Sequence, residues 1–153
     1  MKTIVLGMDG SEGAKRAVPV AVGLARQAGA RLVIAYIDER IAAKGDMPSL
    51  RADADEVRAE IGRVAEEITA EGVETTVEEA MVVLGGPAHA IARIASDVDA
   101  EMIVVGTRGH SPVAGLLLGS VTERLLHIAK RPDRTPMSTP PGARAIDEFR
   151  PRP

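Results

Sequence analysis

The 153-residue chain contains no cysteine and no tryptophan, and it has one tyrosine and one phenylalanine. Without cysteine, disulfides, thiol nucleophiles and cysteine-based metal sites are all excluded. Aromatic residues make up 1% and hydrophobic residues 45% of the chain, so the core must be built from Val, Ile, Leu, Ala and Met. No apolar run approaches the about 18 residues of a membrane span, and the N-terminal apolar segment is too short for a signal peptide. We therefore expect a soluble, cytoplasmic protein with no membrane partner.

The charge is nearly balanced. The net charge is -3 and the pI is about 5.7, which gives no support for nucleic-acid binding. The length corresponds to about one domain.

Short apolar runs alternate with amphipathic segments of helical length. Strands alternating with helices imply parallel pairing through right-handed crossovers. The pattern therefore predicts an α/β fold, an open and mostly parallel twisted sheet with helices on both faces. In the third strand apolar and polar residues alternate, which favours an edge position. The predicted strands cover residues 3–8, 31–37, 73–83 and 102–105, and the predicted helices cover 12–28, 52–70 and segments that start at 87 and 120.

A glycine-rich stretch follows the fourth predicted strand. The chain reads Gly106-Thr107-Arg108-Gly109, and after nine intervening residues Gly119-Ser120 opens an amphipathic helix. Glycines allow close backbone approach, and the free N–H groups at a helix start attract phosphate. The alternative is that Ser120 to Glu123 form a capping box and the glycines only shape loops. No Walker motif and no GxGxxG are present, so neither a P-loop nor a dinucleotide fingerprint is indicated.

The spacing Gly106-x-x-Gly109-x(9)-Gly119-Ser120 resembles the nucleotide-binding signature of the universal stress protein family, in its ATP-binding branch. The N-terminal stretch IVLGMDGSEGAKRAV is similar to that family's opening strand and acidic turn. The resemblance covers about residues 2–132 and implies a Rossmann-like domain over residues 1–132, followed by an irregular tail rich in Pro and Arg over 133–153.

The resemblance also implies a ligand, ATP with Mg²⁺, and a set of contacts. Asp9 would face the ribose or a hydrated Mg²⁺, the backbone at Tyr36 would meet adenine, and Val105 and Gly106 would lie beside the ribose. The glycines of the loop and the helix start would hold phosphate. The full set implied is Gly7, Asp9, Tyr36, Val105, Gly106, Gly109, Gly119, Ser120 and Val121.

Structural explanations stand beside these roles. Asp9 and Glu12 have the spacing of a capping box, and Tyr36 could pack against the end of the sheet with its ring away from any ligand. Arg108 and His110 could neutralise phosphate charge, or simply be solvated loop residues.

The sequence provides no catalytic set and no dedicated metal site. His89 and His127 have no ligand spacing with a carboxylate, and no triad can be assembled. We therefore expect at most weak ATP hydrolysis, because neither an arginine finger nor a water-positioning base is evident. The leading interpretation is a nucleotide-dependent regulatory stress-response protein with an unidentified protein partner. The alternatives are a slow ATPase or phosphotransferase using Asp9 and Mg²⁺, and a non-nucleotide assembly module.

The C-terminal end departs from the family pattern. The family usually has an apolar fifth strand just after an Arg-Pro pair, whereas this chain has Asp133-Arg134-Thr135-Pro136 after Arg131-Pro132. We expect this strand to be missing, residues 133–153 to lie outside the fold, and the fourth strand to keep an unpaired edge. In many family members the fifth strand pairs two subunits, so the homodimer is expected to be weakened or altered.

Overall fold

The computed structural model describes residues 1–38, 48–81, 86–107, 120–128 and 143–147. Strands and helices alternate along these residues, as the apolar pattern predicts. The elements are β1 (Thr3–Met8), α1 (Glu12–Ala28), β2 (Arg31–Asp38), α2 (Pro48–Ala70), β3 (Thr75–Met81), α3 (Gly86–Asp97), β4 (Met102–Gly106), α4 (Ser120–Ile128) and β5 (Ala143–Asp147).

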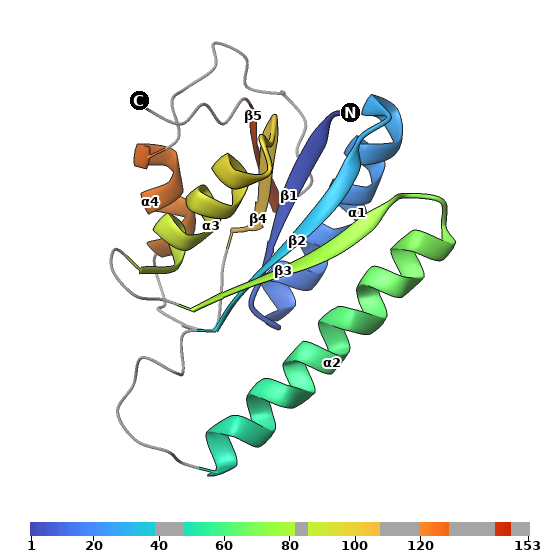
Figure 1. Ribbon diagram of the computed structural model, residues 1–153. Helices are drawn as coiled ribbons and strands as arrows, with labels where there is room; N and C mark the ends of the chain where they lie inside the picture. Colours follow the sequence, from blue (N-terminus) through green and yellow to red (C-terminus); the bar gives the residue numbers. More distant parts are fainter. Residues whose placement is uncertain (39–47, 82–85, 108–119, 129–142, 148–153) are drawn as a thin grey trace.

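The described strands form one twisted sheet in the order β3-β2-β1-β4-β5 (Figure 1). The first four strands are parallel, with Gly7 of β1 in register with Ala35 of β2 on one side and Val105 of β4 on the other. The predicted parallel α/β sheet is therefore confirmed. The predicted edge strand is also confirmed, since β3 ends the sheet and exposes most of its side chains.

Two apolar layers hold the helices against the two faces of the sheet. Residues alternate along β1, so that Ile4 and Leu6 point into the layer under α1 and α2, while Val5 points into the layer under α3 and α4. This alternation follows from the two-residue period of a strand. Helices cover both faces of the sheet (Figure 1), as predicted.

The C-terminal segment contributes a strand where the sequence predicts an irregular tail. Residues Ala143–Asp147 pair antiparallel with β4, with Gly106 in register with Ala143. The expected unpaired edge of β4 is therefore wrong, and so is the expectation that all of 133–153 lies outside the fold. A buried strand edge needs partners for its N–H and C=O groups, and this strand supplies them. The position directly after Arg131-Pro132, where the resemblance puts a fifth strand, lies outside the described residues.

Candidate functional site

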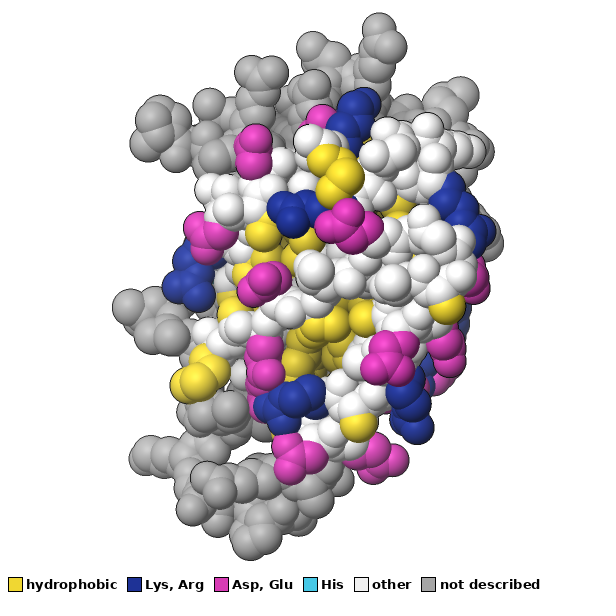
Figure 2. Space-filling view, turned by 45° about the vertical axis from the view of Figure 1, so that its right-hand side comes forward, with side chains coloured by type: hydrophobic (Ala, Val, Ile, Leu, Met, Phe, Trp, Pro, Cys, Tyr) yellow, Lys and Arg dark blue, Asp and Glu magenta, His cyan; other side chains and the backbone are white. Residues whose placement is uncertain are grey.

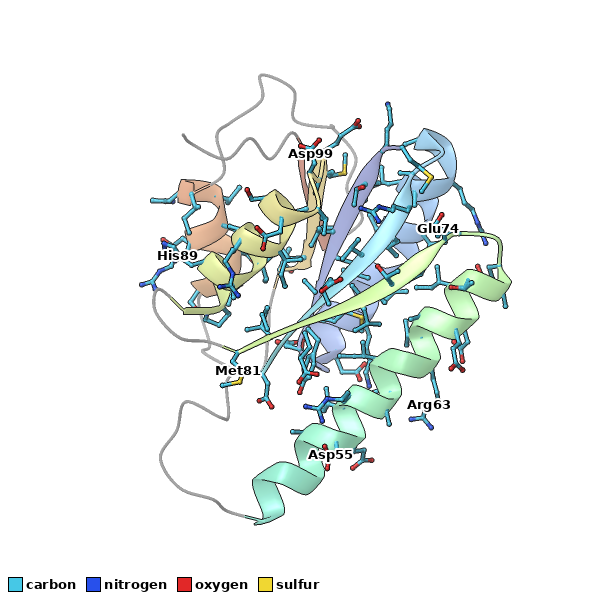
Figure 3. The ribbon with its side chains drawn as sticks, in the orientation of Figure 1. Asp55, Arg63, Glu74, Met81, His89 and Asp99 are labelled. Atoms are coloured by element: carbon cyan, nitrogen blue, oxygen red, sulfur yellow. The ribbon has the colours of Figure 1, made fainter. Side chains whose placement is uncertain are left out.

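The carboxyl ends of β1 and β4 lie side by side at the point where the strand order reverses. From β1 the chain builds outward through β2 to β3, and it then returns to place β4 on the other side of β1. Open α/β sheets bind ligands at this switch point, because the two connections leave in opposite directions. Met81, at the carboxyl end of β3, lies at this edge of the sheet, while Glu74 and Asp99 mark the amino edge (Figure 3).

A tight acidic turn joins β1 to α1 at this edge. The Asp9 carboxylate accepts a hydrogen bond from the Ser11 N–H (Oδ1 to N, 2.9 Å), and the Ser11 hydroxyl oxygen accepts one from the Ala14 N–H (3.2 Å). Ser11 is thus the N-cap of α1, rather than Asp9 as the capping-box alternative has it. The Asp9 carboxyl group is therefore oriented by the turn at the end of β1.

Gly10 in the same turn brings α2 close to the site. Its φ of 79° is a conformation that favours glycine, and a Cβ there would lie 2.9 Å from Cγ1 of Val57. Val57 of α2 therefore packs directly over the acidic turn.

Gly106 is the junction of three elements. A Cβ on this residue would lie 2.5 Å from the backbone C and O of Gly13 and 2.8 Å from the N of Ala14, so the first turn of α1 approaches β4 closely. Its carbonyl oxygen accepts a hydrogen bond from the Thr122 hydroxyl at 2.9 Å. The end of β4 is therefore held by the starts of both α1 and α4.

The start of α4 lies beside this junction. Ser120 is exposed and is the first residue of α4, whereas an N-cap would lie just before the first helical residue. The helix therefore begins one residue earlier than an N-cap at Ser120 predicts. Val121 is half-buried. Leu125 is fully buried, whereas the neighbouring Leu126 is 40% exposed. The first N–H groups of a helix have no intrahelical acceptor, so this end can bind an anion.

Gly7 and Tyr36 have clear packing roles. A Cβ on Gly7 would lie 2.9 Å from Cγ1 of Val105 and 3.2 Å from Cδ1 of Ile91. Close packing in the core therefore accounts for a glycine at this position. The Tyr36 side chain is 3% exposed and lies in the layer under α1 and α2. Only the backbone of Tyr36 would be available to a ligand at the edge.

Arg58 of α2 is paired with acidic side chains of α2 and β3. The Arg58 guanidinium contacts both carboxylate oxygens of Glu79 at 2.6 and 3.0 Å and Oδ1 of Asp55 at 2.6 Å. The hydrogen bond from Arg58 lowers the pKa of Glu79, and the bond to Glu79 raises the pKa of Arg58. Acidic and basic side chains are interspersed on the face in Figure 2, where no basic patch gathers.

The described residues bring Gly7, Asp9, Val105 and Gly106 together, with α4 and its Ser120 and Val121 joined to them through Thr122. Gly109, Gly119, Arg108 and His110 lie outside the described residues. Within the described ranges, no group of three or more metal-ligating side chains is present, and no helix is long and apolar enough to cross a membrane. Thr122 was not among the predicted site residues, although it lies within the segment from Ser120 to Glu123 that was predicted to begin the helix.

Most of the chain is similar to one protein family. Residues 1–133 match the Universal stress protein family. A universal stress protein of Thermus aquaticus, from the 3' region of its QAH/OAS sulfhydrylase, is 36% identical over 134 residues, covering 86% of this chain and 95% of that protein.

Solved structures of this fold are also similar. A universal stress protein in complex with cAMP is 30% identical with a TM-score of 0.58, over 82% of this chain and 88% of that one. The universal stress protein from Archaeoglobus fulgidus in complex with dAMP is 24% identical with a TM-score of 0.60, over 86% of this chain and 94% of that one, and this likeness concerns the fold.

Proposed function

This chain belongs to the universal stress protein family, and on that premise we propose that it is a regulatory protein that binds adenine nucleotides, ATP with Mg²⁺ in particular. The observation that carries the proposal is the junction at Gly106. It joins the first turn of α1, which directly follows the acidic turn, to the end of β4 and the start of α4 at the switch point of the sheet. The cAMP complex of a 30% identical relative supports the choice of an adenine nucleotide.

Each part of the edge has a distinct task in this proposal. Asp9, held by its bond to the Ser11 N–H, accepts hydrogen bonds from ribose hydroxyls or from water on Mg²⁺. The free N–H groups at Ser120 and Val121 attract phosphate, and the backbone at Tyr36 and Val105 meets the nucleoside. Gly109 and Gly119 complete the phosphate contacts.

The biological role follows from binding without efficient chemistry. We propose that the occupied site changes the surface around the start of α4, and that a protein partner in the cytoplasm recognises this change during a stress response. The functional unit is a homodimer whose interface is altered by the unusual C-terminal segment. Hydrolysis is at most slow in this scheme.

Thermal unfolding with ligand tests the proposal. The free energy of unfolding should rise by about 2.7 kcal/mol when the free ATP·Mg²⁺ concentration is 100 times its dissociation constant, which raises the midpoint by about 8 °C for a domain of this size. ADP and AMP should give smaller shifts and GTP the smallest. If the protein unfolds cooperatively and none of the four nucleotides changes its unfolding midpoint, the proposal is refuted and an assembly module is favoured.

A charge-matched pair of variants then tests the role of Asp9. Asp9→Asn keeps an acceptor for the Ser11 N–H but removes the charge, and it should reduce the Mg²⁺-dependent part of the ATP shift. Asp97→Asn, at the far end of α3, removes the same charge at the amino edge and should leave the shift intact. Rapid ATP turnover lost in Asp9→Asn would instead support the ATPase alternative.

A further inference from the structure

Thr122 is a buried polar residue on the first turn of α4. Its side chain is 2% exposed, and its hydroxyl donates to the Gly106 carbonyl oxygen at 2.9 Å, across 16 positions of sequence. Buried hydroxyl groups need such a partner, because leaving one without a hydrogen bond costs free energy. The bond therefore links the end of β4 to the start of α4, the two elements that flank the glycine-rich segment.

The acceptor end of this bond is fixed. Gly106 lies against the backbone of Gly13 and Ala14, so β4 cannot shift toward α1 at this point. In the parallel sheet, Gly106 directly follows Val105, which is in register with Gly7. The hydrogen bond to this carbonyl therefore fixes the position of α4 relative to the central strands β1 and β4.

Apolar packing alone would position α4 less well. Leu125 is fully buried one turn after Thr122 and anchors the same side of the helix. Apolar contacts are not directional and tolerate small slides and rotations of a helix. A hydrogen bond has a preferred length and angle, so the Thr122 hydroxyl restricts both.

We propose that Thr122 is a positioning residue that sets the N–H groups of the first turn of α4 for a phosphate-bearing ligand. This inference rests on the proposed function, which already gives phosphate contacts to the start of α4, and it adds that the Thr122 hydroxyl holds this helix start in place. Thr122 acts through its side chain on Gly106. The ligand meets the backbone of α4 instead, so removing the hydroxyl should weaken phosphate contacts and spare nucleoside contacts.

Two substitutions at position 122 and a ligand series test the assignment by calorimetric titration. Thr122→Val keeps the shape and removes the hydroxyl. ATP should then bind up to about five-fold more weakly, because the roughly 1 kcal/mol of one intramolecular hydrogen bond is the most that its loss can take from the positioned helix start. AMP should lose less, and adenosine should stay within about two-fold of wild type. Thr122→Ser keeps the hydroxyl and should restore ATP binding to within about two-fold.

Thr3→Val is the matched control. Thr3 is also 2% exposed, and its hydroxyl oxygen accepts from Nε of Arg31 at 3.0 Å, but it lies at the amino edge of β1. This variant should match wild type for all three ligands. If Thr122→Val does not unfold cooperatively, Thr122→Ala replaces it, since its smaller side chain places no methyl group against the Gly106 carbonyl.

The outcomes separate this inference from the proposed function. A wild-type chain that binds none of the three ligands overturns both. A wild-type chain that binds ATP, with a Thr122→Val variant that binds it equally well, overturns the positioning role alone. An equal loss of affinity for adenosine and ATP in Thr122→Val also overturns the positioning role, because general destabilisation of the protein weakens the binding of all ligands alike.

Discussion

The close approach at Gly106 makes a strong prediction about stability. In Gly106→Ala the new Cβ would lie 2.5 Å from two backbone atoms of Gly13 and 2.8 Å from the N of Ala14. Backbone atoms cannot rotate away as a side chain can, so the first turn of α1 or the end of β4 must move. Overpacking of this kind costs about 3 kcal/mol, at the upper end of its usual range.

A gain from the unfolded state offsets part of this cost. Alanine restricts the unfolded chain more than glycine does, which stabilises the protein by about 0.7 kcal/mol. The net loss is then about 2 kcal/mol, which lowers the unfolding midpoint by about 6 °C for a domain of this length. Urea unfolding followed by circular dichroism measures the same loss at constant temperature.

Gly23 provides a matched control on α1. A Cβ at Gly23 would have no atom within 4 Å, and the residue lies inside the helix. Gly23→Ala should therefore stabilise the protein by about 1 kcal/mol through helix propensity alone. If Gly106→Ala proved as stable as wild type, the packing of α1 against β4 described above would be wrong.

Three further changes have defined outcomes. Ser11→Ala removes the N-cap of α1 and should cost about 1 kcal/mol in urea unfolding, and no change would contradict the capping role. Glu79→Gln should cost at most about 1 kcal/mol at pH 7, because the paired side chains are 41% and 39% exposed. The Arg58 hydrogen bond lowers the pKa of Glu79 below its ordinary 4.5, so this stabilisation is present above pH 4.5 and disappears as pH falls through the folded-state pKa. A difference that stayed constant down to pH 3 would count against that pair. Gly10→Ala should cost more than Gly29→Ala, since both have positive φ but only Gly10 faces Val57, and thermal midpoints compare them.

Local signals made much of the fold predictable. The predicted bounds of β1 and α1 match the structure, because Ser11 caps the helix start and Gly29 ends it with a φ of 60°. The start of α2 lies four residues before the predicted position 52, at Pro48. Proline is well suited to the first turn of a helix, and the apolar stripe used for the prediction begins only later.

Long-range contacts were less accessible from the sequence. The segment Ala143–Asp147 has no apolar run, and its strand depends on the edge that β4 offers, as strand formation often depends on tertiary context. Gly106 shows a related ambiguity. A ligand and a neighbouring helix both require a missing side chain, so the glycine motif could not show that Gly13 and Ala14 approach this residue.

The most direct test of the central claim is a titration of the ¹⁵N-labelled protein with ATP·Mg²⁺, followed by amide chemical shifts. We predict saturable shifts at Asp9, Gly106, Ser120 and Val121, at the carboxyl edge of β1 and β4. Amides at the amino edge, such as that of Arg31, should change little. Saturable shifts confined to the amino edge or to β3, or no shifts at millimolar ATP, would contradict nucleotide binding at the carboxyl edge of β1 and β4.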